Sequence, residues 1–104
     1  MGLFAKGDIV IFPFPYTDLK DRKLRPCLVL SSEMHDDILL CQITSSVIKK
    51  DEFSVEIDNL RVKSYIRANM LFTADKNQIS KKIASVSSYK YDEVVSKIIK
   101  AITR

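Results

Sequence analysis

The apolar residues of this chain change their spacing once, and that change limits the folds that the chain can adopt. Up to residue 86 they come in short runs rich in Val, Ile, Leu and Phe, which are typical of β-strands. Strands are expected over residues 8–14, 27–30, 38–44, 53–57, 64–75 and 81–86. From Tyr91 to Ile102 the apolar residues recur every three or four positions, which predicts an amphipathic helix. A series of strands closed by one helix indicates a mainly β fold, a small curved antiparallel barrel.

Two polar segments divide the predicted strands. The segment from Pro15 to Arg25 is rich in charge and is interpreted as a long loop. The turn between the next two strands is expected at residues 35–37. Both segments join neighbouring strands, so each pair is expected to be antiparallel.

The length and composition fit one globular domain over residues 1–104. The chain has 46% hydrophobic and 29% charged residues, close to ordinary globular usage. It has no apolar run near the roughly 20 residues that span a membrane, and its first residues lack the pattern of a signal peptide. We therefore expect a cytoplasmic protein without a membrane partner.

The sequence disfavours proteins built around a metal or a nucleotide cofactor. It has two cysteines, Cys27 and Cys41, and His35 is the only histidine, whereas a structural zinc site needs about four such ligands. Both cysteines lie within apolar runs and are expected to be reduced and buried. Its two glycines, Gly2 and Gly7, cannot form a glycine-rich phosphate loop. No metal and no cofactor are expected.

The net charge of +4 suits a nucleic-acid partner, although many proteins that bind no nucleic acid share it. Lys20, Arg22 and Lys23 form a basic cluster in the first polar segment, and other predicted loops carry further lysines and arginines. These side chains either follow the backbone of single-stranded RNA or serve as ordinary solubilising charge.

Five stretches of the chain together form a family pattern: GDIVIFPFPYTD (7–18), RPCLVLSS (25–32), QITSS (42–46), SYIRANMLFTADK (64–76) and KKIASVS (81–87). In this order they resemble the MazF/PemK family of toxin endoribonucleases. The resemblance implies an SH3-like barrel that pairs into a homodimer. It also implies cleavage of single-stranded RNA at short sequences and a partner antitoxin that holds the activity in check.

The resemblance further implies that Arg25 and Thr44 are the catalytic residues. Metal-independent cleavage uses the 2′-hydroxyl of the RNA as nucleophile and builds negative charge on the phosphorus group. An arginine fork matches that charge, and a hydroxyl beside it can donate to a non-bridging oxygen. Without the family context, Arg25 would be interpreted as a solvated cation in a loop. Thr44 would be interpreted as a residue at a strand end whose side chain bonds to the backbone.

Four further residues are candidates for RNA binding. Ser45 and Ser46 offer hydroxyl donors to a phosphate, or are simply turn residues. Arg67 and Asn69 share one face of a regular strand and either bind RNA or lie on the surface. One branch of the family has an aspartate at the position of Asn69, and an amide cannot replace that acid–base group. No general base is identified from the sequence.

A second function remains open. The same barrel can serve as a non-catalytic toxin or binding module that acts on a protein target, for instance through its C-terminal helix. The presence of both Arg25 and Thr44 distinguishes the endoribonuclease hypothesis from the binding-module hypothesis, because protein binding alone does not require this pair.

Overall fold

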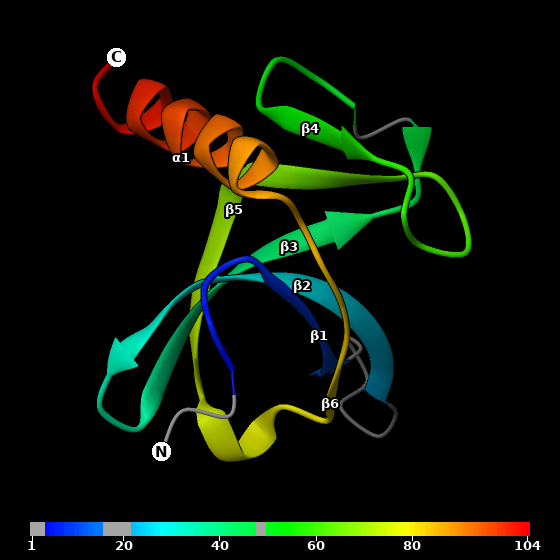
Figure 1. Cartoon of the computed structure of the whole chain (residues 1–104), viewed down its shortest axis with the longest axis vertical. Coiled ribbons are helices and arrows are strands. Elements are labelled where there is room, and N and C mark those ends of the chain that lie inside the picture. The colour runs from blue at the N-terminus through cyan, green and yellow to red at the C-terminus, as the bar shows by residue number, and fades with distance from the viewer. Residues whose placement is uncertain (1–3, 16–21, 48–49) are drawn as a thin grey trace.

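The computed structural model describes residues 4–15, 22–47 and 50–104, and its regular elements follow the predicted order (Figure 1). The chain forms β1 (Asp8–Pro15), β2 (Arg22–Met34), β3 (Asp37–Thr44), β4 (Ser54–Ile57), β5 (Ser64–Asp75), the short 3-10 helix η2 (Lys76–Gln78), β6 (Lys81–Ser85) and α1 (Ser88–Ile102). The prediction of a mainly β fold with one C-terminal helix is confirmed.

The strands form one antiparallel sheet in the order β4-β5-β3-β2-β1-β6. The sheet curls into a half-barrel, with β4 and β6 at its two edges, and α1 lies across β4 and the first part of β5 (Figure 1). Because neighbours in the chain are mostly neighbours in the sheet, short connections suffice for most of the fold.

Strand β2 is longer than its apolar run predicts. β2 begins at Arg22 rather than Cys27, because its polar first residues pair with β1 from Pro15↔Arg22 to Ile11↔Pro26. The predicted loop from Pro15 to Arg25 is therefore too long by five residues, since Pro15 ends β1 and residues 22–25 belong to β2. Backbone pairing does not require apolar side chains, so hydrophobic runs alone underestimate such strands.

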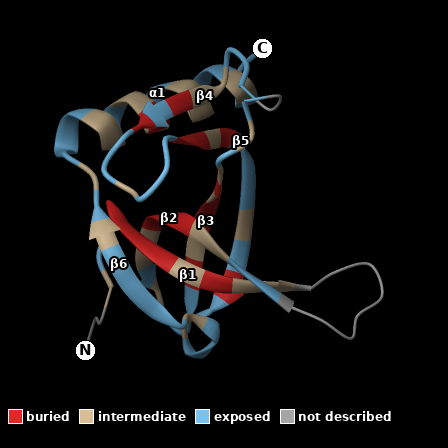
Figure 2. Cartoon of the chain, turned by 90° about the vertical axis from the view of Figure 1, so that its right-hand side faces the viewer, coloured by how far each residue is buried: buried red, intermediate tan, exposed pale blue. Residues whose placement is uncertain are grey.

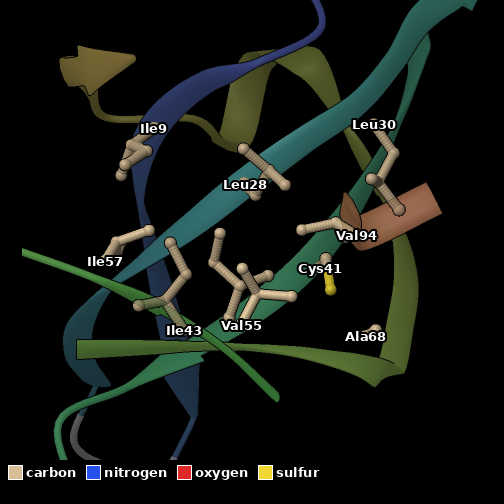
Figure 3. Close-up of a cluster of buried hydrophobic side chains, with 10 residues drawn as sticks. Ile9, Leu28, Leu30, Cys41, Ile43, Val55, Ile57, Ala68 and Val94 are labelled. Carbon is tan, nitrogen blue, oxygen red and sulfur yellow. The ribbon is translucent and has the colours of Figure 1, made fainter. Parts of the chain in front are cut away.

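Each side of the central strands carries its own apolar core, which explains the continuous apolar runs. On one side, ten buried residues including Ile9, Leu28 and Val94 pack together, and Val94 brings α1 into the cluster (Figure 3). On the other side, a second cluster includes Val10, Cys27 and Leu40. Buried residues accordingly run without interruption from Asp8 to Val10 in β1 and from Cys27 to Leu30 in β2 (Figure 2).

The hairpin between β2 and β3 closes at the predicted turn. Met34 pairs with Asp37, so the turn is two residues long, and its first residue, His35, has φ of 61°. A positive φ at the first turn position matches the right-handed twist of the flanking strands. This turn sets the register of β2 against β3, although two irregularities shift that register further along.

Candidate active site

Arg25 and Thr44 are brought together by the β2–β3 pairing. Cys27 lies opposite Gln42, and the same register continued by two residues sets Arg25 opposite Thr44. Both side chains are half-buried. The sequence-based expectation that they lie at the same end of one hairpin is therefore met by the geometry of the sheet.

The Thr44 hydroxyl has a fixed local partner. Its Oγ1 accepts a hydrogen bond from the backbone N–H of Ser46 at 3.1 Å. A hydroxyl that accepts one bond still has its own proton to donate. The Ser46 amide therefore orients the Thr44 oxygen without using its donor, which suits a hydroxyl that approaches an anionic oxygen.

A pocket of about 490 Å³ lies at this end of the sheet, and Arg25 and Thr44 both line it. This volume is within the range of about 300–1,000 Å³ that is common for ligand sites. Its wall also carries Lys23, Ser45 and Arg61, and no carboxylate is among the described residues that line it. With three cations and no acid, the pocket favours an anionic ligand.

The rest of the pocket wall is apolar and comes from distant parts of the chain. Leu24 of β2, Val62 of the β4–β5 loop and Ile83 of β6 all line it, with exposed fractions of 60%, 59% and 42%. Asn59 holds that loop to β6, since its Nδ2 donates to the Ser85 carbonyl at 2.9 Å. The sequence analysis missed this wall, because only the curl of the sheet brings β6 and the loop beside β2.

Arg67 lies outside this pocket but close to it along the sheet. It is half-buried in β5, and its Nη1 donates to Gln42 Oε1 at 3.4 Å. Its Nε is buried and has no hydrogen-bond partner among the described residues. Gln42 was not singled out from the sequence, although its position two residues before Thr44 places it on the same face of β3.

The backbone of Arg67 is held by a buried thiol. The Sγ–H of Cys41 donates to the Arg67 carbonyl at 2.8 Å. Burial raises the pKa of Cys41 to about 12, against a smaller opposing effect of the Arg67 charge. The thiol therefore stays protonated at neutral pH and remains a donor.

Asn69 occupies an irregular part of β5. The β3–β5 register shifts between Ile43↔Ile66 and Cys41↔Leu71, so β5 has extra residues there. Three consecutive residues, 69–71, are exposed. Side chains alternate strictly between the two faces only in a regular strand. This segment is irregular, so the basis for expecting Arg67 and Asn69 on one face is absent here.

The basic cluster is only partly described. Lys20 lies outside the described residues, as does the side chain of Arg22, whereas Lys23 is exposed at the pocket. Phe12, Phe14 and Phe72 pack together, with ring centroids 5.2 Å apart for Phe12 and Phe14 and 5.3 Å from each of these to Phe72. These rings belong to the second apolar core or pack against it.

The described residues show neither a metal site nor a membrane-spanning helix. Within them, no group of three or more His, Cys, Asp or Glu side chains is arranged to hold a metal ion. The one long helix found there is also too short and too polar to cross a membrane.

Comparison with known proteins identifies the family. The family model of the PemK-like, MazF-like toxins of type II toxin–antitoxin systems matches residues 5–102. A comparison with curated proteins gave no match.

Solved structures share the fold. The chain is similar to MazF in a MazE–MazF complex from Deinococcus radiodurans, with a TM-score of 0.83, 22% identity, and 98% and 97% of the two chains covered. For an endoribonuclease bound to its cognate antitoxin from a mycobacterial species, the TM-score is 0.78 at 13% identity, with 95% and 94% covered. For the Mycobacterium tuberculosis toxin MazF-mt6 it is 0.75 at 20% identity, with 91% and 95% covered. The match over nearly the whole chain means that this protein belongs to the family of PemK-like, MazF-like toxins of type II toxin–antitoxin systems.

Proposed function

We propose that this protein is a metal-independent endoribonuclease that cleaves single-stranded RNA at short sequences. The observation that carries the proposal is the pocket where Arg25 and Thr44 meet, lined by three cations and by no described carboxylate. Family membership supports the toxin role, and the similar mycobacterial structure is that of an endoribonuclease.

In the proposed reaction, the 2′-oxygen attacks the adjacent phosphorus, loses its proton, and forms a 2′,3′-cyclic phosphate. The bond from phosphorus to the 5′-oxygen breaks, and that oxygen takes up a proton. Arg25 stabilises the extra negative charge of the transition state, and the Thr44 hydroxyl donates to a non-bridging oxygen. Since no carboxylate lines the described part of the pocket, no acid there competes with the phosphate for Arg25.

Seven residues are proposed to bind the RNA on either side of the cut: Ser45, Ser46, Arg67, Asn69, Lys20, Arg22 and Lys23. Lys23 and Ser45 line the pocket, and Arg67 forms no ion pair with the described residues, which supports this role. Base preference then depends on how these side chains contact the unstacked bases.

A cognate antitoxin and a second copy of the chain are the proposed protein partners. Structures of two similar proteins contain an antitoxin, and type II toxins act within toxin–antitoxin pairs. The exposed Leu24, Val62 and Ile83 form an apolar rim at the pocket, which either partner can cover. Sedimentation at micromolar concentration is expected to give the mass of two chains.

Incubation of the pure protein with a long single-stranded RNA in EDTA tests the activity. Discrete cuts with 2′,3′-cyclic phosphate ends are expected. Arg25→Ala is expected to lower the cleavage rate about 100-fold or more, because a lone transition-state donor is typically worth that much. Lys100→Ala removes an equal charge from α1, away from the pocket, and is expected to cut at the wild-type rate.

Circular dichroism establishes that each variant is folded. Cleavage by Arg25→Ala at the wild-type rate would contradict the assignment of the site. Failure of the folded, antitoxin-free wild type to cut any RNA would contradict the endoribonuclease itself. That result would favour a non-catalytic toxin with a protein target, for which the exposed Ile99 and Ile102 on α1 offer a contact surface.

A further inference from the structure

We infer that Gln42 is a positioning residue that fixes the Arg67 guanidinium beside Thr44, an inference that rests on the proposed function. Arg67 is a half-buried cation, and among the described residues it forms no ion pair. Its only side-chain hydrogen bond there is the one that Nη1 donates to Gln42 Oε1 at 3.4 Å.

The main chain around Arg67 is anchored on both sides. The Cys41 thiol donates to the Arg67 carbonyl at 2.8 Å, and the Ala68 N–H donates to the Phe53 carbonyl at 3.0 Å. These bonds fix where the side chain starts. The position of its charged end is left to Gln42, the one described group that the guanidinium touches through a hydrogen bond.

The sheet register puts this contact next to the proposed catalytic pair. Thr44↔Tyr65 and Ile43↔Ile66 are cross-strand pairs, and continuing that register sets Gln42 opposite Arg67. Gln42 and Thr44 are two residues apart on one strand face, a distance of about 6.7 Å. Gln42 therefore holds the Arg67 guanidinium at the position next to Thr44 on the same face of β3.

The chemistry of this contact explains why the residue is an amide. A carboxylate at residue 42 would pair with Arg67 and cancel its charge, whereas the neutral amide orients the guanidinium and leaves the charge for an RNA phosphate. Of the five N–H donors of the guanidinium, one is bonded to Gln42. A guanidinium that is already held in place, with N–H donors still free, loses less conformational entropy on binding than a mobile guanidinium.

The first experiment uses the free protein. In ¹⁵N NMR, the buried Nε–H of Arg67 is expected to exchange slowly with water. Gln42→Met has a similar length but no strong acceptor, and it is expected to speed that exchange about tenfold. Gln42→Glu restores an acceptor and is expected to keep the exchange slow. Unchanged exchange in Gln42→Met would overturn the inference, and Gln42→Leu, which also lacks an acceptor, takes its place if Gln42→Met does not fold.

The second experiment measures coupling on RNA. With an RNA that is 2′-deoxy at the cut, Gln42→Met is expected to weaken binding about tenfold, the typical value of a hydrogen bond to a charged group. In the Arg67→Met background, the same change is expected to have less than a twofold effect. Equal losses in both backgrounds would mean that Gln42 acts independently of Arg67, and would overturn the inference.

Gln42→Glu separates charge from position on the same RNA. This variant is expected to keep the Arg67 Nε–H protected from exchange but to weaken RNA binding. The new carboxylate holds the Arg67 guanidinium and also neutralises its charge. If the wild type neither binds nor cuts RNA, the proposed function fails, and the exchange rates still decide whether Gln42 holds Arg67.

Discussion

Cys27 and Cys41 show how single side chains serve this fold without taking part in chemistry. Both are fully buried, one in each apolar core, and neither forms a disulfide. Burial raises the pKa of each thiol to about 12; the proximity of Cys41 adds to the effect on Cys27. A thiol with so high a pKa is a poor nucleophile at neutral pH.

These raised pKa values predict that the protein loses stability in alkali. Below about pH 9 the thiols are protonated in both states, and their contribution is fully present. Between about pH 9 and 12 only the unfolded thiols ionise, so the free energy of unfolding falls by up to about 1.4 kcal/mol per pH unit for each thiol. Urea unfolding followed by circular dichroism at pH 8, 9 and 10 measures this slope.

Cys27→Ala is the matched comparison, because tyrosines and lysines titrate equally in both proteins. The variant is expected to be less stable at pH 8 but to lose stability less steeply above pH 9. Parallel slopes for the two proteins would show that the Cys27 thiol does not carry the effect.

At the scale of elements, α1 is attached to the half-barrel by one buried residue and several polar ties. Val94 is fully buried in the first core, and the Tyr91 hydroxyl donates to the Leu30 carbonyl at 2.6 Å. Near the C-terminus, Lys97 Nζ donates to the Glu52 carbonyl, and the Arg104 guanidinium pairs with the Glu52 carboxylate. The helix thus contacts the segment just before β4, whose Phe53 carbonyl accepts from Ala68.

The start of α1 makes a prediction about its stability. Ser87 is the N-cap, and its Oγ accepts from the Lys90 N–H at 3.1 Å. Ser87→Ala removes that acceptor and is expected to lower the free energy of unfolding by about 0.5–2 kcal/mol. Ser88→Ala, within the first turn, is expected to change it by less than about 0.5 kcal/mol. Urea unfolding of both variants tests this, and equal losses would rule out capping as the cause.

On the scale of the whole molecule, charge is distributed unevenly. The net charge is +4, and the pocket at Arg25 and Thr44 gathers Lys23, Arg25 and Arg61 without a described carboxylate. Some cations elsewhere are paired, as Lys82 is with Asp8 at 3.2 Å and Lys63 with Glu56 at 3.3 Å. The pocket therefore concentrates positive charge where the RNA phosphate is proposed to bind.

This distribution predicts how RNA binding depends on salt. Each phosphate contact on a single strand adds about 0.7 to the slope of log affinity against log salt. With the 2′-deoxy substrate, Lys23→Ala is expected to reduce the slope by about 0.7, and Lys100→Ala to leave it unchanged. Fluorescence anisotropy between 50 and 300 mM salt measures it. Equal slopes for all three proteins would remove Lys23 from the interface.

The sequence predicted the elements and part of the site, for reasons that differ from residue to residue. Arg25 and Thr44 were expected at the same end of one hairpin because the strands that carry them are consecutive in the chain. Their exact register depends on two irregularities between the turn and that end. Gln42 and the apolar wall of Leu24, Val62 and Ile83 were missed. Gln42 contacts Arg67, which lies on another strand. The residues of the wall lie about 20 positions or more apart in the chain.

By itself, the sequence determined the order and type of the elements, because the period of apolar side chains is a local property that each strand or helix must satisfy against a core. Only the tertiary structure decided which polar residues meet. The strand order β4-β5-β3-β2-β1-β6, the curl of the sheet and the irregular stretch of β5 put Arg67 on Gln42 and close the pocket around Arg25. Burial and pairing of a charge depend on neighbours from distant parts of the chain, and no local pattern encodes them.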